Sequence, residues 1–410
     1  MMAAENAHIS EKISFLTNIL SSWDGSEQRQ ALRREPRRYV SYDYTGMDAE
    51  QSERLRALIY HAQSTTISFP LWHAAAELSD NASSGQQDIV IPREYLWCYR
   101  NIGSVALWLD DVRGGSVYDL KYITATGLLG LTGELGKEWK AIDTMVMPVF
   151  QGVLAMDDSF TSRTDIVSEM TLNFELLQNQ NAQPFFPKQY DVEYDEEMPA
   201  TWGYQHGLPA LYKGVEVWRY EPQWADNLDG KFTKNANRID YDTGVFKFDP
   251  KSYNPSETRE ITYALKSRAM INNLARFFYR HKGAWKSFWA PTWICDMELL
   301  ESVEAGSMQM NVKMLWYWKY YNKSGRRKKI VVFFKDGTCQ ILGISGYSRD
   351  QFNTYGVVFL EEPPKKEIVR ERVLMISFFC RYRFESDDLL IDYETSRVAT
   401  ASITLKEVDN

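Results

Sequence analysis

Two stretches of the chain share one frame: FPLWHAAAEL, from Phe69 to Leu78, and SFWAPTWICDMEL, from Ser287 to Leu299. Each contains Pro-x-Trp and, five residues after the tryptophan, Glu-Leu. A shift of 221 positions superposes the two frames without a gap and also aligns residues ahead of them. The identical pairs are Arg38 and Arg259, Tyr42 and Tyr263, Pro70 and Pro291, Trp72 and Trp293, Glu77 and Glu298, and Leu78 and Leu299. This internal repeat predicts two related modules in one chain.

The segment ahead of each Pro-x-Trp corner predicts a helix. Within residues 48–63, Asp48 and Gln51 form a capping-box pattern, and apolar residues then recur at i, i+3, i+4 and i+7. Residues 268–282 repeat the apolar spacing, and Gly283 supplies a stop signal. We therefore expect one amphipathic helix in each module, leading into the corner.

After each corner the pattern changes to that of strands. Residues 105–109 and 330–334 are runs of β-forming residues, and the second run is followed by the turn signal Asp336-Gly337. Both halves also end alike, since TSRTDIVSEMTLNFE from Thr161 resembles TSRVATASITLKE from Thr395. The sequence therefore predicts a mainly β fold of two related β-sandwich modules, each with one packed helix. The expected boundaries are 1–179 for the first module, 180–222 for a proline-rich acidic connector or arm, and 223–410 for the second module.

Composition narrows the class of protein. The net charge of -8 argues against a dedicated nucleic-acid binder, and the 14% of aromatic residues favours pleated surfaces and interfaces. The four cysteines show no CxxC spacing, so we expect buried, reduced thiols and no metal or redox site. No apolar run has the length of a membrane helix, and the N-terminus lacks the pattern of a signal peptide, so synthesis and folding in the cytoplasm are expected.

A catalytic centre is not expected. Cys295-Asp296 could form half of a nucleophilic site with His281 as its base, but the first corner has Ala-Ala at the matching place. The repeated corner therefore does not depend on the thiol and the carboxylate. We predict no catalytic, cofactor-binding or metal-binding residues, and a hydrolase remains only an alternative, to be tested by Cys295→Ala or Asp296→Ala.

Two clusters in the second module are candidates for contacts. The string WYWKYY, which contains Trp316 and Trp318, suits a strand that is buried on both faces or lies at a subunit contact. The basic run Arg326, Arg327, Lys328 and Lys329 suits a hairpin tip that faces an acidic neighbour. As an alternative function, these tryptophans with Trp285 and Trp289 could form the platforms of a carbohydrate-binding β-sandwich in a receptor-recognition apparatus.

The first module resembles the distal tail proteins of long-tailed bacteriophages. The resemblance rests on a G-x-E-x-R stretch at Gly25, Glu27 and Arg29, followed by a strand, a helix and an aromatic corner. A second element of that family is best matched in the later module, by Phe277, Phe278, Arg280 and Gly283. Members of the family usually carry one such module, whereas this chain carries two.

The resemblance implies tail-tube-like modules in a virion structural protein at the tail tip, synthesised in the host cytoplasm. Such a protein forms a ring that joins the tail tube to the baseplate or hub. A chain with two modules would match a hexameric tube as a trimer with pseudo-six-fold symmetry, and a hexamer is the alternative. The implied partners are further copies of the chain, the tail tube protein, the hub or baseplate proteins and the tape-measure protein, with DNA only in passage through an acidic lumen.

Overall fold

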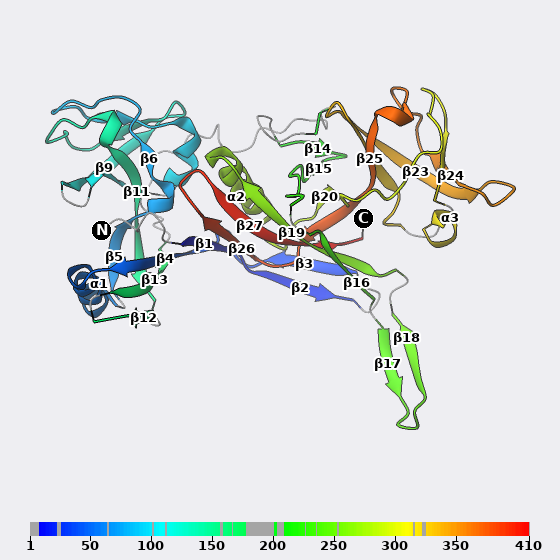
Figure 1. The fold of residues 1–410 in the computed structure, drawn as a ribbon, viewed down its shortest axis with the longest axis horizontal. Coiled ribbons are helices and arrows are strands. Elements are labelled where there is room, and N and C mark those ends of the chain that lie inside the picture. The colour runs from blue at the N-terminus through cyan, green and yellow to red at the C-terminus, as the bar shows by residue number, and fades with distance from the viewer. Residues whose placement is uncertain are drawn as a thin grey trace.

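The computed structural model confirms a mainly β fold (Figure 1). It describes residues 8–22, 26–63, 65–100, 102–110, 113–155, 159–165, 167–177, 201–202, 209–225, 227–234, 236–251, 254–314, 316–321 and 325–409. Most of the predicted connector, 180–222, and the motif residue Gly25 therefore lie outside the described residues.

The first module begins with four strands, the middle two of which form a hairpin while the outer two pair with each other, and continues through a helix into a set of antiparallel strands. Its elements are β1 (Ile9–Ser14), β2 (Thr17–Ser21), β3 (Glu27–Ala31), β4 (Arg37–Met47), α1 (Ala49–Ala62), β5 (Thr66–Pro70), η1 (Trp72–Ala74), β6 (Ala76–Glu77), β7 (Asp88–Val90), η2 (Arg93–Tyr99), β8 (Ser104–Asp110), β9 (Gly114–Ile123), β10 (Leu128–Leu131), η3 (Ala141–Asp143), β11 (Met145–Leu154), β12 (Ser159–Ser162) and β13 (Ser168–Leu176).

The second module has the same order of elements after a short hairpin, β14 (Leu211–Tyr212) and β15 (Val215–Glu216). Its elements are β16 (Asp229–Thr233), β17 (Ala236–Asp240), β18 (Phe246–Pro250), β19 (Ser256–Leu265), α2 (Arg268–His281), β20 (Phe288–Pro291), β21 (Gln309–Val312), α3 (Tyr317–Tyr320), β22 (Lys329–Phe334), β23 (Cys339–Arg349), β24 (Gly356–Leu360), η5 (Arg370–Arg372), β25 (Val373–Phe384), β26 (Asp388–Tyr393) and β27 (Ala399–Glu407).

The strand pairings of the first module recur in the second. Ten strand pairs of the first module correspond, in the same order, to ten pairs of the second. In the first module they are β1–β4, β2–β3, β4–β13, β5–β11, β7–β10, β8–β9, β8–β11, β9–β10, β11–β13 and β12–β13. In the second they are β16–β19, β17–β18, β19–β27, β20–β25, β21–β24, β22–β23, β22–β25, β23–β24, β25–β27 and β26–β27. All are antiparallel. Each module also has its own large apolar core. We infer an internal duplication, because chance would not reproduce ten pairings in one order.

The Pro-x-Trp corner has the same place in both modules. Pro70 lies opposite Val149, and Pro291 lies opposite Phe379, in the paired strands β5–β11 and β20–β25. The tryptophan of each corner then contacts an aromatic residue of the next strand pair. Trp72 meets Trp108 of β8 edge-on, with ring centroids 5.6 Å apart, and Trp293 stacks on Phe333 of β22 at 5.3 Å. The corner is thus a packing element in both copies.

Both predicted helices form, with the predicted ends. Asp48 caps α1 in a full capping box with Gln51, and Ser267 caps α2. Lys282 ends α2 in the left-handed conformation and Gly283 follows with φ +63°.

The strand and helix before the corner correspond at a shift of 219 rather than 221, as the two N-caps show. The expected pairs Arg38–Arg259 and Tyr42–Tyr263 are therefore two residues out of register. The reason is the loop between helix and corner, which is longer in the second module: eight positions separate Ala62 from Pro70, and ten separate His281 from Pro291.

The last hairpin of each module, β12–β13 and β26–β27, also corresponds to the other, but the residues align differently from what the sequence suggested. Thr164 Oγ1 accepts a hydrogen bond from the backbone N–H of Val167 at 2.9 Å, and Thr395 Oγ1 accepts one from Val398 at 3.0 Å. Thr164, not Thr161, is thus the counterpart of Thr395. The shift is 231 at this turn, and strand β13 corresponds to β27 at the same shift through its pairing with β11.

One continuous run of strands passes through both modules: β12, β13, β4, β1, β26, β27, β19 and β16 (Figure 1). Strand β1 lies between β4 of its own module and β26 of the other, with Ile9 opposite Tyr42 on one side and Tyr393 on the other. The run therefore consists of two corresponding four-stranded units joined by β1 and β26. Strand β1 therefore belongs to the sheets of both modules, and the predicted division of the chain at residue 179 does not separate the modules completely.

Candidate functional site

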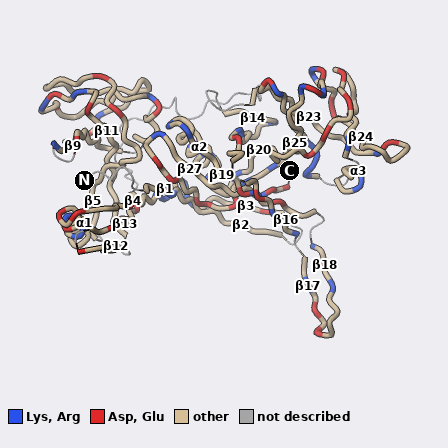
Figure 2. Tube along the Cα trace, viewed as in Figure 1, with Lys and Arg blue, Asp and Glu red and all other residues tan. Residues whose placement is uncertain are grey.

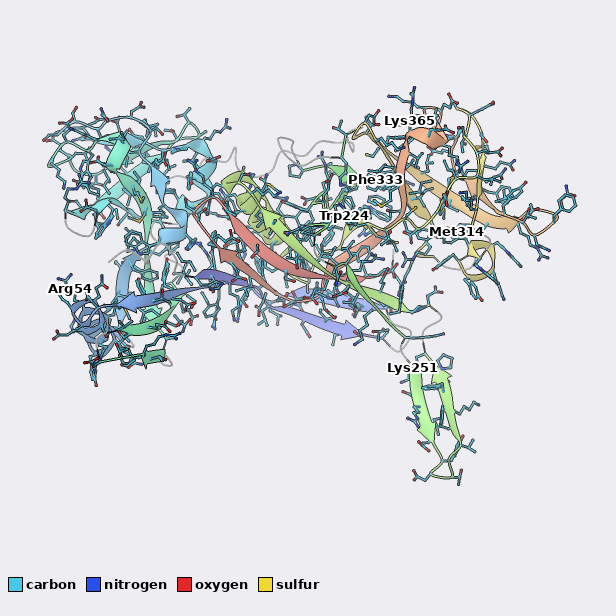
Figure 3. All side chains as sticks on the ribbon, viewed as in Figure 1. Arg54, Trp224, Lys251, Met314, Phe333 and Lys365 are labelled. Atoms are coloured by element: carbon cyan, nitrogen blue, oxygen red, sulfur yellow. The ribbon has the colours of Figure 1, made fainter. Side chains whose placement is uncertain are left out.

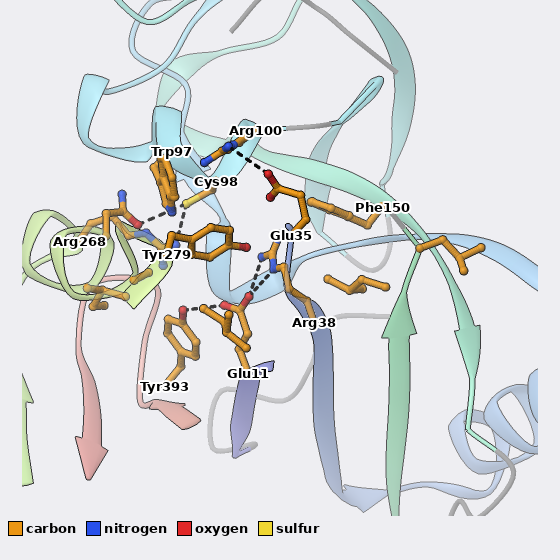
Figure 4. Close-up of a pocket in the computed structure, with 16 residues that line it drawn as sticks. Glu11, Glu35, Arg38, Trp97, Cys98, Arg100, Phe150, Arg268, Tyr279 and Tyr393 are labelled. Atoms are coloured by element: carbon orange, nitrogen blue, oxygen red, sulfur yellow. Dashed lines mark hydrogen bonds and ion pairs between the residues drawn. The ribbon is translucent and has the colours of Figure 1, made fainter. Parts of the chain in front are cut away.

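The most elaborate site in the described residues is the contact between the modules, here called the module joint. It consists of β1, the hairpin β2–β3 and η2 of the first module together with their partners in the second. At its centre is Glu11 of β1, which is 4% exposed (Figure 4). Its carboxylate accepts hydrogen bonds from Arg38 Nε at 2.7 Å and from the Tyr393 hydroxyl at 3.0 Å, and it lies 3.4 Å from His73 Nε2. Burial would raise the pKa of Glu11, but the Arg38 guanidinium and His73 hold it well below its usual range.

A second part of the joint connects α2 with η2. Arg268, at the first position of α2, donates to the carbonyl of His73 at 3.0 Å and to the Cys98 sulfur at 2.6 Å. Asn272 donates to the carbonyl of Glu94 at 2.5 Å. The cavity that remains among these groups has a volume of about 50 Å³, far below the several hundred Å³ of a typical ligand pocket. The polar groups of the joint therefore hold two modules together rather than line a substrate site.

The third part of the joint is the hairpin β2–β3, which lies against β25 and β27. Glu27 accepts hydrogen bonds from Arg383 Nε at 2.8 Å and from Lys406 Nζ at 2.8 Å. Burial alone would raise the pKa of Glu27, but these two cations hold it at about 2. Glu27 is one of the two family-motif residues of this hairpin that the structure describes. The other, Arg29, is half-buried on the same face of the hairpin.

The base of this hairpin is fixed by Asp387, in the turn between β25 and β26. The Asp387 carboxylate accepts from the backbone N–H of Thr17 at 2.6 Å, from its hydroxyl at 2.8 Å and from the N–H of Ala284 at 2.9 Å. Gly283 packs directly against it, because a Cβ there would lie 2.6 Å from Asp387 Oδ1. Asp387 thus connects the base of the β2–β3 hairpin to the end of the second motif segment, although the two lie in different halves of the sequence.

The remaining motif residues are parts of the second core. Phe277 and Phe278 of α2 are 0% and 1% exposed. Arg280 pairs with the buried carboxylate of Glu216 on β15. These three side chains hold α2 on its module and so fix the position of Arg268 and Gly283.

The sequence suggested that the basic run forms a hairpin tip that faces an acidic neighbour, but its two arginines are buried within the chain. Arg326 and Arg327 are 8% and 6% exposed. Arg327 Nη2 donates to Glu257 at 2.7 Å, and Arg326 Nε donates to Asp409 at 2.5 Å. These carboxylates lie 70 and 83 positions away from their arginines in the sequence, so no local pattern could indicate them. Lys328 and Lys329 are half-buried, and Lys329 lies 4.9 Å from the ring centre of Trp289.

The aromatic string is the helical turn α3 rather than the expected strand. Trp316 is 61% exposed, whereas Trp318 packs on the second core. Trp289 is 5% exposed and stacks on Phe379 with ring centroids 5.2 Å apart. Of the four tryptophans proposed as sugar platforms, Trp289 is buried and Trp316 is exposed, and Trp285 and Trp318 are half-buried, so they do not form one exposed surface.

The Cys295-Asp296 pair has structural partners. Asp296 accepts from the Thr292 hydroxyl and, at 2.8 Å, from the backbone N–H of Phe378, which ties the corner to β25. Cys295 donates to the carbonyl of Met297 at 3.3 Å. His281 is bonded to the carbonyl of Phe277 at 2.9 Å, and burial lowers its pKa to about 3. Within the described ranges no group of His, Cys, Asp or Glu side chains could hold a metal ion.

Neither the models of known protein families nor the curated proteins that were searched match this chain. Among the described helices, none has the length and apolarity needed to cross a membrane. Basic and acidic residues are interspersed along both modules, without a single basic face in this view (Figure 2).

Proposed function

We propose that the protein is a structural component of a homo-oligomeric ring, assembled head to tail through copies of the module joint. The observation that carries this proposal is that the joining strands and helices have counterparts away from the joint, at the two edges of the eight-stranded run and at α1 and α3. Within the described residues, those counterparts make no contact with one another.

The counterparts of the joining strands are both edges of the eight-stranded run. Strand β1 corresponds to β16, which pairs only with β19 in the described structure, and all five of its residues are exposed. Strand β26 corresponds to β12, which pairs only with β13 there. An open edge strand invites pairing with another chain. If β16 pairs with β12 of the next copy as β1 pairs with β26, Gly230 lies opposite Phe160.

The counterparts of the helical contact are α3 and α1. In the joint, η2 of the first module packs on the start of α2. The equivalent contact would bring α3 of one copy, with exposed Trp316 and Tyr320, onto the start of α1 in the next copy. The acidic Glu50 in the first turn of α1 and Lys319 of α3 are suited to meet there. Trp316 thus remains a proposed interface residue.

Such a contact joins two different surfaces, so it repeats from copy to copy and closes into a ring when the rotation allows. Together with the two motif residues placed in the joint, Glu27 and Gly283, this supports placing the ring at the distal end of a bacteriophage tail, between tail tube and baseplate or hub. The ring would be structural, without turnover of a substrate. Its partners would be the tube, hub or baseplate and tape-measure proteins, with DNA passing through the lumen.

The mass of the assembled particle tests the ring. One chain has a mass of 47.7 kDa, so a trimer has three times and a hexamer six times that mass. Light scattering and negative-stain images should show annular particles of one of these masses, with an opening wide enough for duplex DNA. A chain that keeps the mass of a monomer at every concentration and does not cross-link to itself would contradict the proposal.

A cross-link tests the strand register. Ser10 lies opposite Asp392 in the joint, and the corresponding residues are Asp229 on β16 and Thr161 on β12. In a Cys295→Ala background, the Asp229→Cys and Thr161→Cys variants should form an intermolecular disulfide when mixed. Neither variant alone should yield that heterodimer. A control pairing of Asp229→Cys with Ser68→Cys on β5 should not react.

A further inference from the structure

The hairpin β17–β18 extends away from the body of the protein, and its side chains lie clear of the rest of the chain (Figure 3). Alternation along β18 gives it two different faces. Phe246 and Phe248, with ring centroids 5.6 Å apart, share one face and are 50% and 57% exposed. Lys247 and Asp249 occupy the other face. An apolar face exposed to this extent on a projecting hairpin indicates a contact with another molecule.

The hairpin β2–β3 is the counterpart of β17–β18 in the first module. Both have five paired residues on each strand, five residues between the strands, and the same hydrogen bond next to the strand ends, from Ser22 N to Ser26 O and from Tyr241 N to Val245 O. This register makes Phe246 the counterpart of Glu27. It likewise makes Phe248 the counterpart of Arg29, and Arg238 the counterpart of Ile19. The face that β2–β3 turns toward the second module is thus the face on which β17–β18 carries its phenylalanines.

The surface that receives β2–β3 also has a counterpart, on the first module. Because Pro70 and Pro291 fix β11 against β25, Arg383 corresponds to Val153. Lys406 corresponds to Glu175 at the shift of 231 that relates β13 to β27. Val153 and Glu175 line one groove of about 560 Å³, together with Tyr39 and Lys12. The groove lies on the surface that corresponds to the one β2–β3 covers in the second module.

The hairpin and the receiving surface change their chemistry together. In the module joint, the acidic Glu27 meets two cations. At the corresponding positions of the repeat, Phe246 takes the place of Glu27 on the hairpin, and the apolar Val153 takes the place of the cation Arg383 on the receiving surface. The second cation, Lys406, is replaced by the acidic Glu175, which lies 3.7 Å from Arg37. The hairpin gains Arg238, whose guanidinium lies 3.1 Å from Asp240 and 4.6 Å from the ring centre of Phe246. The hairpin and its receiving surface thus both differ from their counterparts in the module joint, yet the two remain complementary to each other. This indicates that the two surfaces bind each other.

We propose that β17–β18 of one copy lies in the Val153–Glu175 groove of a second copy of this chain. Phe246 contacts Val153 there, and Arg238 faces Glu175. This inference rests on the proposed head-to-tail assembly and identifies which residues make its intermolecular hairpin contact. The occupant is a second copy, rather than a different protein, because the groove matches the chain's own hairpin and repeats a contact that the chain already makes internally.

A photo-reactive phenylalanine analogue tests the contact directly. Placed at 246 in the full chain, it should cross-link to residues 151–155 or 173–177. Isotope-labelled and unlabelled chains are mixed so that mass spectrometry separates adducts between copies from adducts within one copy. The same analogue at Lys247, on the opposite face, is the matched control and should give few such adducts. Absence of adducts between copies, or adducts on any other surface, would overturn the proposal.

An exchange of charges provides the second test. Phe246→Glu on the hairpin should raise the concentration of half-association by about tenfold or more, as should Val153→Arg with Glu175→Lys in the groove. A mixture of the two variants should recover association between unlike chains, because the Phe246→Glu hairpin and the Val153→Arg/Glu175→Lys groove together restore the ionic contact of the module joint. Far-ultraviolet circular dichroism confirms that each variant is folded. Single variants that associate like the wild-type chain, or a mixture that does not recover, would overturn the proposal.

The two tests separate this inference from the ring. Annular particles without the cross-link from 246 to the groove would contradict the hairpin contact and leave the ring standing. Cross-linked open chains of copies would support the hairpin contact and contradict ring closure.

Discussion

At the scale of single residues, Gly283 shows how the joint constrains the sequence. Its φ of +63° disfavours any side chain, and a Cβ would collide with Asp387, the residue that binds the base of β2–β3. We expect Gly283→Ala to destabilise the protein and to release the hairpin. The matched control is Gly306→Ala, since Gly306 has φ +95° but nothing within 4 Å of a Cβ.

Backbone strain alone should make Gly306→Ala cost about 1–2 kcal/mol. Gly283→Ala should cost clearly more, measured by denaturant unfolding, and should increase hydrogen exchange in β2–β3. Equal costs for the two variants would mean that the contact with Asp387 does not matter.

His281 makes the stability of the second module depend on pH. Burial lowers the pKa of His281 to about 3, below the ordinary value of 6.5, and the groups that face it include Glu216, Arg280, Lys286 and Arg381. The unfolded chain therefore takes up a proton between pH 6.5 and 3 that the folded chain does not. The free energy of unfolding should fall as the pH falls through this window, by up to about 1.4 kcal/mol per pH unit for one proton.

Comparison with His281→Phe isolates this effect. The raised pKa of Glu216 acts in the opposite sense in both proteins, so the difference between the two unfolding curves removes most of its contribution. The wild-type chain should lose stability relative to the variant below pH 6.5. A difference that does not change with pH would show that His281 is not buried as the neutral ring.

At the scale of elements, β1 depends on a buried charge. Glu11→Gln removes the carboxylate that Arg38 needs and leaves its guanidinium without compensation at the centre of the joint. Breaking a buried pair from one side costs about 3–5 kcal/mol. The amide protons that β1 and β26 share in their pairing should also exchange with solvent faster. The control is Glu50→Gln on α1, where the pair with Arg54 is exposed and worth less than about 1 kcal/mol. A similar small cost for both variants would contradict the role of Glu11.

The helices and the corner could be predicted from sequence because their signals are local. A capping box, a 3.6-residue period and a Pro-x-Trp frame each involve residues that are close in the chain. The joint gave no such signal. Glu27 and Arg383 are 356 positions apart, and Arg326 appears solvated until Asp409 is placed beside it. The alternation Phe246-Lys247-Phe248-Asp249 did carry the period of a two-faced strand and could have revealed β18.

At the scale of the whole molecule, the internal and intermolecular contacts should respond differently to salt. The hairpin contact within one chain consists of the ion pairs of Glu27. The proposed contact between chains instead has the apolar pair of Phe246 and Val153 at its centre, with a single ion pair, Arg238 and Glu175, beside it. Apolar contacts are not screened by salt, whereas exposed ionic contacts are. Between about 0.05 M and 0.5 M ionic strength, the half-association concentration of the wild-type chain should therefore change less than about threefold.

The charge-exchanged pair provides the comparison that makes this result informative. In a mixture of Phe246→Glu with Val153→Arg/Glu175→Lys, the contact between the substituted hairpin and the substituted groove is ionic and exposed, and the reverse contact is the wild-type one. The half-association concentration of the mixture should rise about tenfold or more over the same range of salt, measured by sedimentation or light scattering. If the wild-type chain were the more salt-sensitive of the two, ionic edges such as Glu50 with Lys319 would dominate the assembly, and the apolar face of β17–β18 would have to be assigned to a different partner.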